Sequence, residues 1–345
     1  MRPTLARRLL GSPAGWLRRA EMDPAARRWF DAQTFTATDF AAEELLAAKA
    51  ETADTVSVVI PARNEAATVA GVVEQIAALV ESGLVDELVV IDSDSSDDTA
   101  ARARAAGAQV YAAAEIATGT EPVPGKGEAL WKSLFVTSGD LLVFIDADLT
   151  EWGPHFVTGL LGPLLGDPQT LLVKGFYDRL ADDLPASEQL APQGGRVTEL
   201  CARPLLNLYW PELAAVVQPL AGEWAIRREL MGRLAVPVGY GVEFASLTDT
   251  WQLHGLAAIA RVDLVRRGHR HQNVHDLGVM AAEILATAMR RLPGGGPSPD
   301  EPAAQLQQYD RRDAGWLSRP VPTLERPAAA ANRWYQARTA AGCSG

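Results

Sequence analysis

The chain of 345 residues contains little cysteine, no excess of basic residues and no long apolar run. Its two cysteines, Cys201 and Cys343, are too few for a disulfide framework or a thiolate zinc site, and they favour a reducing, cytoplasmic compartment. The 43 acidic residues outnumber the 32 basic ones, and the formal net charge of -11 argues against a general nucleic-acid-binding protein. No apolar stretch approaches the roughly 20 residues that cross a bilayer, so we expect no membrane span.

The amino-terminal segment lacks the pattern of a signal peptide. Arginines flank Leu9 and Trp16 there, whereas a signal peptide follows its positive charges with a continuous apolar stretch and a cleavage site. We therefore expect residues 1–27 to form a disordered extension. Met22 is an alternative start of the chain.

The chain does contain an alternation of short β-branched runs and amphipathic segments. This alternation predicts a right-handed series of βαβ units, and hence an α/β, Rossmann-like fold with a mainly parallel central sheet and helices on both faces. In the first half we expect strands at residues 56–60 (ended by Pro61), 87–91, 109–111 and 141–145, and helices from Asn64 and over 99–106 and 128–135.

The second half is less regular. We expect strands near residues 171–176, 215–218 and 258–263, and helices near 198–208, 242–254 and 277–289. Glycine and proline are frequent from residue 293 onwards, which is typical of a linker. Residues 293–345 are therefore expected to be a linker followed by a peripheral tail.

Two aspartates follow the strand expected at residues 141–145. Asp146 and Asp148 point in the same direction because strand side chains alternate between faces, and Ala147 points the other way. Open α/β sheets bind ligands at the carboxyl ends of their strands, where two hard oxygen donors suit Mg²⁺ or Mn²⁺ bound to a diphosphate. The alternative is that Asp148 caps a following turn.

Polar residues also follow the first two strands, at the same edge of the sheet. Residues 61–65 and 92–94 could bind a nucleotide, or they could form a solvated loop that caps a helix. Lys126 lies between Gly125 and Gly127, on a backbone that can approach a ligand closely. These residues do not form a Walker A motif, and a surface turn would explain Lys126 equally well.

Taken together, these motifs resemble a known family. Residues 56–65, 91–99 and 144–149 are similar to the nucleotide-sugar domain of A-type glycosyltransferases. More narrowly, residues 125–131, 174–177, 195–200, 218–223 and 239–243 resemble the glucosyl-3-phosphoglycerate synthases of actinobacteria, and the resemblance covers residues 28–290.

The resemblance implies a retaining transfer of glucose from UDP-glucose to the hydroxyl of 3-phosphoglycerate, dependence on Mg²⁺ or Mn²⁺, and a homodimer. It also implies a place in methylglucose lipopolysaccharide biosynthesis. Within one catalytic domain, residues 28–150 would form the half that binds the nucleotide sugar, and residues 151–292 the half that binds the acceptor.

The resemblance also assigns roles to single residues. It places Asp148 and His269 at the metal, with Asp148 the firmer ligand, and it makes Glu243, Asp148 and Leu220 catalytic. The residues assigned to the donor are Pro61, Ala62, Glu65, Ser93, Lys126, Asp146, Ala147 and Glu243. The residues assigned to the acceptor are Gly195, Arg196, Thr198, Tyr240, His269 and His271.

Arg196 suits an anionic acceptor on physical grounds. Its guanidinium can bind a carboxylate or phosphate through two parallel hydrogen bonds. In the first turn of a helix its charge opposes the helix dipole unless an anion is present. Gly195 and Thr198 add backbone donors and a hydroxyl, and Lys126, Arg267 and His269 complete a small basic region in an acidic chain.

Several alternatives stay open at this point. The donor could be GDP-mannose, the acceptor could be glycerate or another small acid, or the protein could bind a nucleotide sugar without catalysis. His271 stands where the family pattern has an amide side chain near the acceptor. For the chemistry we expect Glu243 to orient the sugar during front-face attack, with the acceptor proton passing to the departing phosphate. Double displacement with Glu243 as nucleophile is the alternative.

Overall fold

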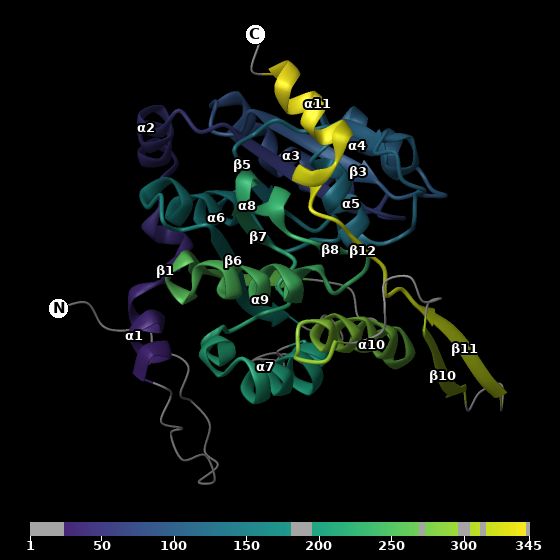
Figure 1. Ribbon diagram of the computed structural model, residues 1–345. Helices are drawn as coiled ribbons and strands as arrows, with labels where there is room; N and C mark the ends of the chain where they lie inside the picture. The colour runs from purple at the N-terminus through teal and green to yellow at the C-terminus, as the bar shows by residue number, and fades with distance from the viewer. Residues whose placement is uncertain (1–23, 181–194, 269–272, 296–303, 311–314, 343–345) are drawn as a thin grey trace.

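A computed structural model describes residues 24–180, 195–268, 273–295, 304–310 and 315–342. Its centre is an eight-stranded sheet with the strand order β1-β9-β6-β7-β5-β2-β3-β4 (Figure 1). In that order the strands span Thr34–Thr36, Ile259–Gly268, Leu172–Leu180, Trp224–Arg227, Leu141–Phe144, Val56–Ala62, Glu87–Asp92 and Gln109–Ala112.

The sheet is mixed but mainly parallel. β2 pairs in parallel with β3 on one side and with β5 on the other, and β9 pairs in parallel with β1 and β6. Only β7 runs against its neighbours β5 and β6 among the strands of this sheet that the structure describes. The predicted α/β fold with a mainly parallel sheet is confirmed.

Alternate residues of the central strands supply two apolar layers, one on each face of the sheet. Val59 belongs to one layer, whereas its neighbours Val58 and Ile60 belong to the other. The first layer includes side chains of α1 (Pro24–Ala32), α5 (Lys126–Ser133), α7 (Arg203–Tyr209), α8 (Arg228–Arg233), α9 (Val242–His254), α10 (Val274–Arg290) and α11 (Arg333–Gly342). The second includes side chains of α2 (Ala42–Thr52), α3 (Val69–Glu81), α4 (Thr99–Ala105) and α6 (His155–Gly166).

Short 3₁₀ and π turns join many of these elements. They are η2 (Ala37–Asp39), η3 (Ala113–Glu115), η4 (Thr198–Ala202), η5 (Pro211–Ala215), η6 (Leu256–Ala258) and η7 (Ala329–Ala331). None of the helices within the described ranges is long and apolar enough to cross a membrane.

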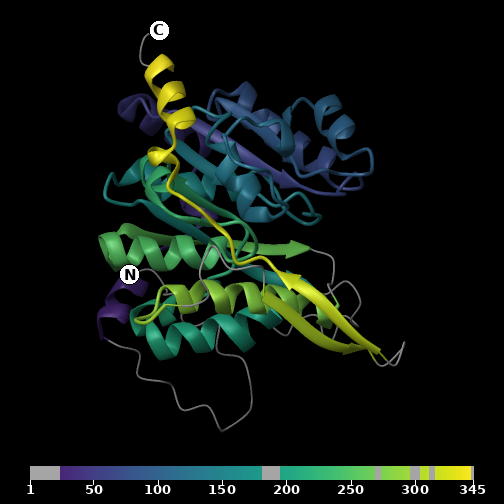
Figure 2. The ribbon, with the colours of Figure 1, turned by 45° about the vertical axis from the view of Figure 1, so that its right-hand side comes forward.

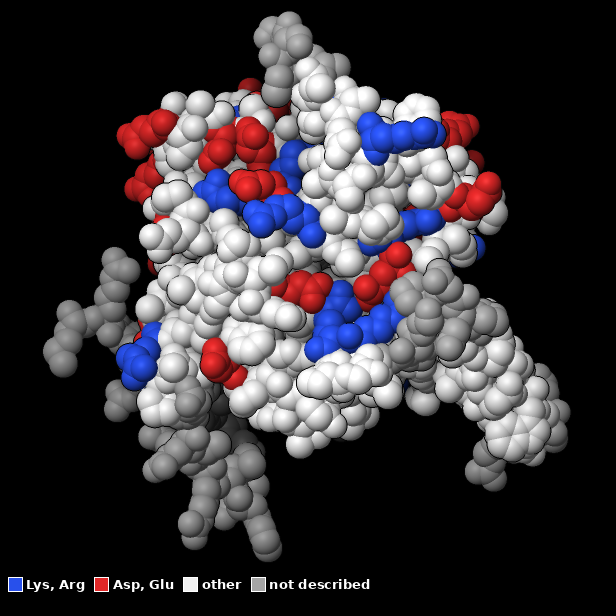
Figure 3. All heavy atoms as spheres, in the orientation of Figure 1, with Lys and Arg blue, Asp and Glu red and all other residues white. Residues whose placement is uncertain are grey.

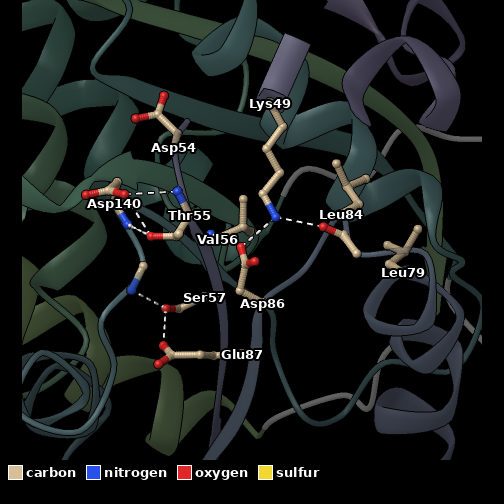
Figure 4. Close-up of polar contacts among 12 residues, drawn as sticks. Lys49, Asp54, Thr55, Val56, Ser57, Leu79, Leu84, Asp86, Glu87 and Asp140 are labelled. Carbon is tan, nitrogen blue, oxygen red and sulfur yellow. Dashed lines mark hydrogen bonds and ion pairs between the residues drawn. The ribbon is translucent and has the colours of Figure 1, made fainter. Parts of the chain in front are cut away.

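A polar network fixes the register of β2 at the edge of the sheet where the strand begins (Figure 4). Asp86 accepts a hydrogen bond from the Val56 backbone and forms an ion pair with Lys49 at 2.6 Å. The Ser57 hydroxyl donates to Glu87, and Thr55 donates to Asp140 from both its backbone and its hydroxyl. Because β2 runs parallel to β3 and β5, the carboxyl ends of all three strands meet at the opposite edge.

The strand predicted at residues 56–60 is longer than expected, because Pro61 does not end it. β2 continues to Ala62, and Pro61 stays in register with Ile91 of β3. Val59 accepts a hydrogen bond from Ile145, so Pro61, two residues further on, directs its nitrogen to the same side. β5 has already ended there at Phe144, so the proline removes no ladder bond.

One further prediction on the second half is wrong. Residues 215–218, which the structure describes, do not form the expected strand, because η5 ends at Ala215 and no strand follows directly. The next strand is β7, which begins at Trp224. The helix expected over 198–208 is confirmed: the π turn η4 continues directly into helix α7. Pro204, near the start of α7, has no N–H to donate to an α-helical hydrogen bond, and the π turn lies immediately before it.

The chain after residue 293 is not simply a peripheral tail. β10 (Ala304–Asp310) and β11 (Gly315–Val321) form a hairpin, and β12 (Glu325–Arg326) pairs with β8 (Val236–Pro237). Figures 1 and 2 show this yellow segment running from the hairpin across the molecule to α11. Arg326 is buried against Glu128, and Trp131 donates to the Pro327 carbonyl.

The amino-terminal boundary also lies earlier than expected. Helix α1 begins at Pro24, and its side chains Ala26 and Trp29 are buried in the core. The part of the proposed extension that precedes residue 24 lies outside the described residues.

Charges on the viewed face are mixed. Figure 3 shows Lys and Arg side chains lying beside Asp and Glu side chains there, and no broad area of one sign. Among the described residues, one ion-pair network joins Arg291 to Asp249 at 2.7 Å and to Glu325 at 2.8 Å.

Candidate active site

A cavity of about 520 Å³ opens where β2, β3 and β5 end. The ends of these strands supply Ala62, Ser93 and Asp146 to its wall, as ligand sites of open α/β sheets require. Every predicted site residue within the described ranges lines this cavity: Pro61, Ala62, Glu65, Ser93, Lys126, Asp146, Ala147, Asp148, Gly195, Arg196, Thr198, Leu220, Tyr240 and Glu243. His269 and His271 lie outside the described residues.

The loops after β2 and β3 are tied to each other by hydrogen bonds. The Asn64 side chain accepts from Ser96, and the Glu65 backbone donates to the Thr99 hydroxyl at 2.8 Å. Asp97 accepts from the backbone of Ala66 at 3.2 Å, and hydrogen bonding to Thr99 lowers its pKa. Asp97 thus stabilises the loop, while Glu65 and Ser93 line the cavity.

Lys126 joins carboxylates from two other parts of the fold. Its Nζ lies 2.6 Å from Asp146 Oδ1 and 2.7 Å from Glu243 Oε1. Burial opposes its charge, but the two carboxylates outweigh burial and raise the pKa of Lys126 well above its usual value. Lys126 is therefore a fixed cation inside the cavity wall and not a residue of a surface turn.

The backbone at Lys126 is packed too closely for any other residues to flank it. A Cβ on Gly125 would lie 2.1 Å from the Val238 carbonyl oxygen, and the φ of Gly125 is +150°. A Cβ on Gly127 would lie 1.8 Å from the Pro237 carbonyl oxygen. The two glycines thus allow α5 to begin directly against the 237–239 segment.

Arg267 gives the Asp-x-Asp pair a second cationic partner. Its Nη2 lies 3.2 Å from Asp146 Oδ2 and donates to Asp148 Oδ1 at 2.8 Å. Its Nη1 contacts Tyr177 and Glu223, both of which are buried. The sequence predicts Arg267 only as part of a general basic region, because no short motif links the end of β9 with Asp146.

The surroundings of Asp146 keep it ionised. Burial opposes its charge, but Lys126 and Arg267 outweigh burial and hold the pKa of Asp146 well below its usual range. The preceding strand fixes its place, and the Thr68 hydroxyl donates to the Ala147 carbonyl at 2.7 Å. The pair of aspartates is therefore a rigid, anionic feature of the wall.

The Asp-x-Asp residues fit a divalent cation. One guanidinium nitrogen contacts both carboxylates, which shows that Asp146 and Asp148 converge on a cationic group. Carboxylate oxygens are the donors that Mg²⁺ and Mn²⁺ prefer, and Mg²⁺ is commonly bound by one or two carboxylates plus phosphate oxygens. No group of three His, Cys, Asp or Glu side chains that could hold a metal occurs among the described residues, so the remaining ligands would come from elsewhere.

The other wall of the cavity is built around η4 and α10. Gly195, Arg196 and Thr198 lie at the start of η4, as predicted for an anion site. The Glu199 backbone donates to the Gly195 carbonyl at 3.0 Å, which makes this the first turn of the helical segment. Apolar residues complete this wall: Val197, Leu277, Met280, Ile284, Pro320 and Pro322.

Two parts of the cavity wall are not predicted from the sequence. Pro320 and Pro322 come from the segment that was expected to be a peripheral tail, and composition alone cannot show that it returns to the site. Glu283 of α10 also lines the cavity and accepts a hydrogen bond from the Tyr240 backbone at 2.6 Å. Its only sequence signal is a carboxylate within the apolar stretch of a helix.

Comparisons with known proteins give the same picture. A model of the glycosyl transferase family 2 matches residues 57–213. Glucosyl-3-phosphoglycerate synthase of Mycobacterium tuberculosis strain H37Rv is 51% identical over 249 residues, which cover 72% of this chain and 76% of that protein. The enzyme of the same name from Petrotoga mobilis is 41% identical over 253 residues, covering 72% of this chain and 77% of that protein.

Solved structures are similar as well. A crystal structure of the M. tuberculosis synthase with Mn²⁺ and UDP-glucose superimposes with a TM-score of 0.73 at 44% identity, covering 84% of this chain and 94% of that one. A structure of that synthase with Mn²⁺, UDP and glucosyl-3-phosphoglycerate gives 0.74 at 44% identity, covering 84% and 95%. A third, with Mg²⁺ and UDP, gives 0.76 at 44% identity, covering 86% and 97%.

Proposed function

Because this chain belongs to the glucosyl-3-phosphoglycerate synthase family, we propose that it is a metal-dependent glucosyltransferase. It moves glucose from UDP-glucose to the hydroxyl of 3-phosphoglycerate and releases UDP and glucosyl-3-phosphoglycerate. One observation carries the proposal: the donor, metal and acceptor residues that the family pattern assigns, where described, line one cavity.

The strand-end loops are proposed to bind the donor. Pro61, Ala62, Glu65 and Ser93 line the part of the cavity wall that follows β2 and β3. The hydrogen bonds between these loops hold them in one conformation, which reduces the entropy lost when a nucleotide binds. This geometry supports their assignment to the nucleoside part of UDP-glucose.

Asp148, together with Asp146, is proposed to hold Mg²⁺ or Mn²⁺ against the diphosphate. A bound divalent ion would act as a Lewis acid that stabilises the charge developing on the departing UDP. The converging carboxylates support this assignment. The metal role of His269 stays a prediction.

Arg196, Gly195 and Thr198 are proposed to bind the phosphate or carboxylate of 3-phosphoglycerate. Their place at the start of η4, on the wall of the same cavity as Asp148, supports an anion site close to the proposed donor site. Tyr240 lines the same cavity and would close over the reacting groups. The acceptor role of His271 stays a prediction.

For the chemistry we favour front-face attack with retention of configuration. Glu243 is buried and ion-paired to Lys126 at 2.7 Å, so its carboxylate is already engaged by a cation, which supports a role in orienting the sugar. The acceptor hydroxyl would pass its proton to the departing phosphate. Leu220, assigned to the catalytic group, lines the cavity next to Gly222 and would position the sugar.

We also propose a homodimer. Large apolar side chains are exposed on η4, α7 and α10: Leu200, Leu208, Tyr209, Val274, Leu285 and Met289. Such surfaces favour association, and light scattering on the purified protein would measure the resulting mass. The cytoplasmic location and the place in methylglucose lipopolysaccharide biosynthesis stay predictions.

The experiment that tests the proposal is a product assay with two donors and two acceptors. UDP-glucose and GDP-mannose are each paired with 3-phosphoglycerate and with glycerate, in Mg²⁺, and products are identified by mass. The proposal predicts hexosyl-3-phosphoglycerate from UDP-glucose. Product from GDP-mannose or from glycerate alone would change the donor or the acceptor, and no nucleotide release with any pair would favour a binding protein without catalysis.

A further inference from the structure

Glu283 lies on α10, outside every element that the family pattern singled out. It is buried, yet its carboxyl group lines the cavity. Its Oε2 accepts a hydrogen bond from the backbone N–H of Tyr240 at 2.6 Å. Helix α10 thus binds the loop before α9 through this carboxylate.

No side chain separates this carboxylate from the loop. A Cβ on Gly239 would lie 1.9 Å from Glu283 Oε2, and a Cβ on Gly241 would lie 2.1 Å from Thr287 Oγ1. Glu283 and Thr287 are four residues apart and so face the same side of α10. The helix therefore packs directly on the backbone of residues 239–241.

The opposite side of the same loop contacts the start of α5. The Glu128 backbone donates to the Val238 carbonyl at 2.9 Å, and the Gly127 backbone donates to the Gly239 carbonyl at 3.3 Å. The loop is thus held between α10 and α5. It leads into the first turn of α9, where Glu243 binds Lys126.

An apolar side chain at position 283 would let α10 pack on the loop without the desolvation cost of a buried carboxylate. Burial is the main cause that raises the pKa of Glu283 to about 7, with a smaller upward contribution from the charge of Glu243 and a downward one from the Tyr240 hydrogen bond. A buried carboxyl group is retained at such a cost when it satisfies a specific polar partner. That partner here is the Tyr240 N–H.

We propose that Glu283 is a positioning residue for the transfer reaction. Its carboxylate fixes the Gly239–Tyr240 loop, and through that loop it fixes Lys126 relative to Glu243. The inference rests on the proposed function, since Lys126 and Glu243 are assigned to the donor and the transferred sugar. Glu283 acts through the backbone of the loop and is not itself a catalytic residue.

Three variants separate this role from simple stabilisation of the helix. Glu283→Ala removes the acceptor of the Tyr240 N–H. Glu283→Gln keeps a side-chain carbonyl that can accept the same bond without the charge. Ala288→Gly is the matched control, because Ala288 is buried in the same helix and is absent from the cavity wall, and glycine weakens a helix interior.

Two readouts are measured on each variant. The first is kcat and KM with UDP-glucose and 3-phosphoglycerate. The second is hydrogen–deuterium exchange of the peptide that contains the Tyr240 amide, which does not depend on turnover. We expect Glu283→Ala to lower kcat by about 10- to 100-fold, as displaced catalytic groups do, and to speed exchange at Tyr240. Glu283→Gln should restore both, and Ala288→Gly should change neither.

The outcomes distinguish the inference from the proposed function. If the unmodified protein makes no product but Glu283→Ala speeds Tyr240 exchange and Glu283→Gln does not, the loop contact stands and the proposed reaction fails. If the protein is active and Glu283→Ala leaves kcat and exchange unchanged, the inference is wrong. It is also wrong if Ala288→Gly lowers kcat as much, or if Glu283→Gln fails to restore it.

Discussion

The ammonium group of Lys126 lies 2.7 Å from Glu243 Oε1 and joins the start of α5 to the first turn of α9. The same nitrogen lies 2.6 Å from Asp146 Oδ1, beyond the end of β5. One partly buried cation thus fixes two carboxylates whose positions depend on different elements. This contact gives the site a defined geometry before any ligand binds, as electrostatic preorganisation requires.

Replacing that cation should disable catalysis. In Lys126→Met, Asp146 and Glu243 lose their shared partner and repel each other, so we expect kcat to fall by about 100-fold or more. Steady-state kinetics with UDP-glucose measure the effect. Lys49→Met is the control, because Lys49 makes its ion pair with Asp86 at the opposite edge of the sheet. Similar losses of kcat in both variants would contradict the role of Lys126.

Removing the proposed metal ligand Asp148 should abolish catalysis and the effect of Mg²⁺ on UDP binding. Asp148→Ala is expected to abolish turnover and to make UDP binding independent of Mg²⁺, because the carboxylate proposed to hold the metal is lost. Calorimetric titration with UDP, with and without Mg²⁺, measures this. Asp140→Ala, which alters only the contact with Thr55 at the far edge, serves as control. Near-normal activity of Asp148→Ala in Mg²⁺ would refute the metal site.

Arg196→Ala should affect the acceptor and spare the donor. Loss of a bidentate donor to phosphate or carboxylate is expected to raise the KM for 3-phosphoglycerate by about two orders of magnitude. The affinity for UDP should stay within the range of the unmodified protein, as calorimetry will show. Equal weakening of donor and acceptor binding would show that Arg196 has no dedicated role in binding the acid.

The segment after residue 320 should contribute to stability as well as to the cavity. Arg326 lies 2.6 Å from Glu128, and both side chains are buried. Arg326→Met leaves the buried Glu128 carboxylate with Lys132, 3.5 Å away, as a cationic partner, so the loss of unfolding free energy should lie below the about 3–5 kcal/mol of a fully broken buried pair. Urea denaturation measures the loss, and Arg338→Met is a control nearer the carboxyl end. Equal stability of the two variants would contradict this role.

Stability should depend on pH through Glu283. Its pKa rises from 4.5 to about 7 on folding, so the folded state holds the proton more tightly than the unfolded state. The resulting stabilisation is complete below pH 4.5 and is lost as pH rises through 7, with a total of about 3 kcal/mol. Glutamine does not titrate, so Glu283→Gln does not lose this stabilisation as pH rises. Its unfolding free energy relative to that of the unmodified protein should therefore increase between pH 5 and pH 8. A difference that stays constant over this range would contradict the assignment.

The sheet and the strand-end residues could be predicted from the sequence because their signals are local. β-Branched runs define β2 and β3, an apolar run defines β5, and Asp146 and Asp148 follow shortly after β5. Where a prediction failed, a longer-range effect decided the outcome. Pro61 is tolerated in β2 because β5 has already ended beside it, which no property of residues 56–62 can show.

The contacts that complete the site are non-local, and this explains why they were missed. Arg267 meets Asp146 and Asp148 only because β9 and β5 belong to the same sheet. Glu283 reaches Tyr240 only because two glycines let α10 pack on the loop backbone. Such close approaches follow from tertiary packing, and the periodicity of residues along the chain does not predict them.

The proposed reaction is tested most directly by one measurement, a ¹H NMR time course of the protein with Mg²⁺, UDP-glucose and 3-phosphoglycerate. It predicts that the anomeric signal of UDP-glucose decreases while a new α-anomeric signal of glucosyl-3-phosphoglycerate grows by the same amount. A signal of UDP-glucose that does not decrease, or that is replaced only by free glucose or by a β-linked product, would contradict it.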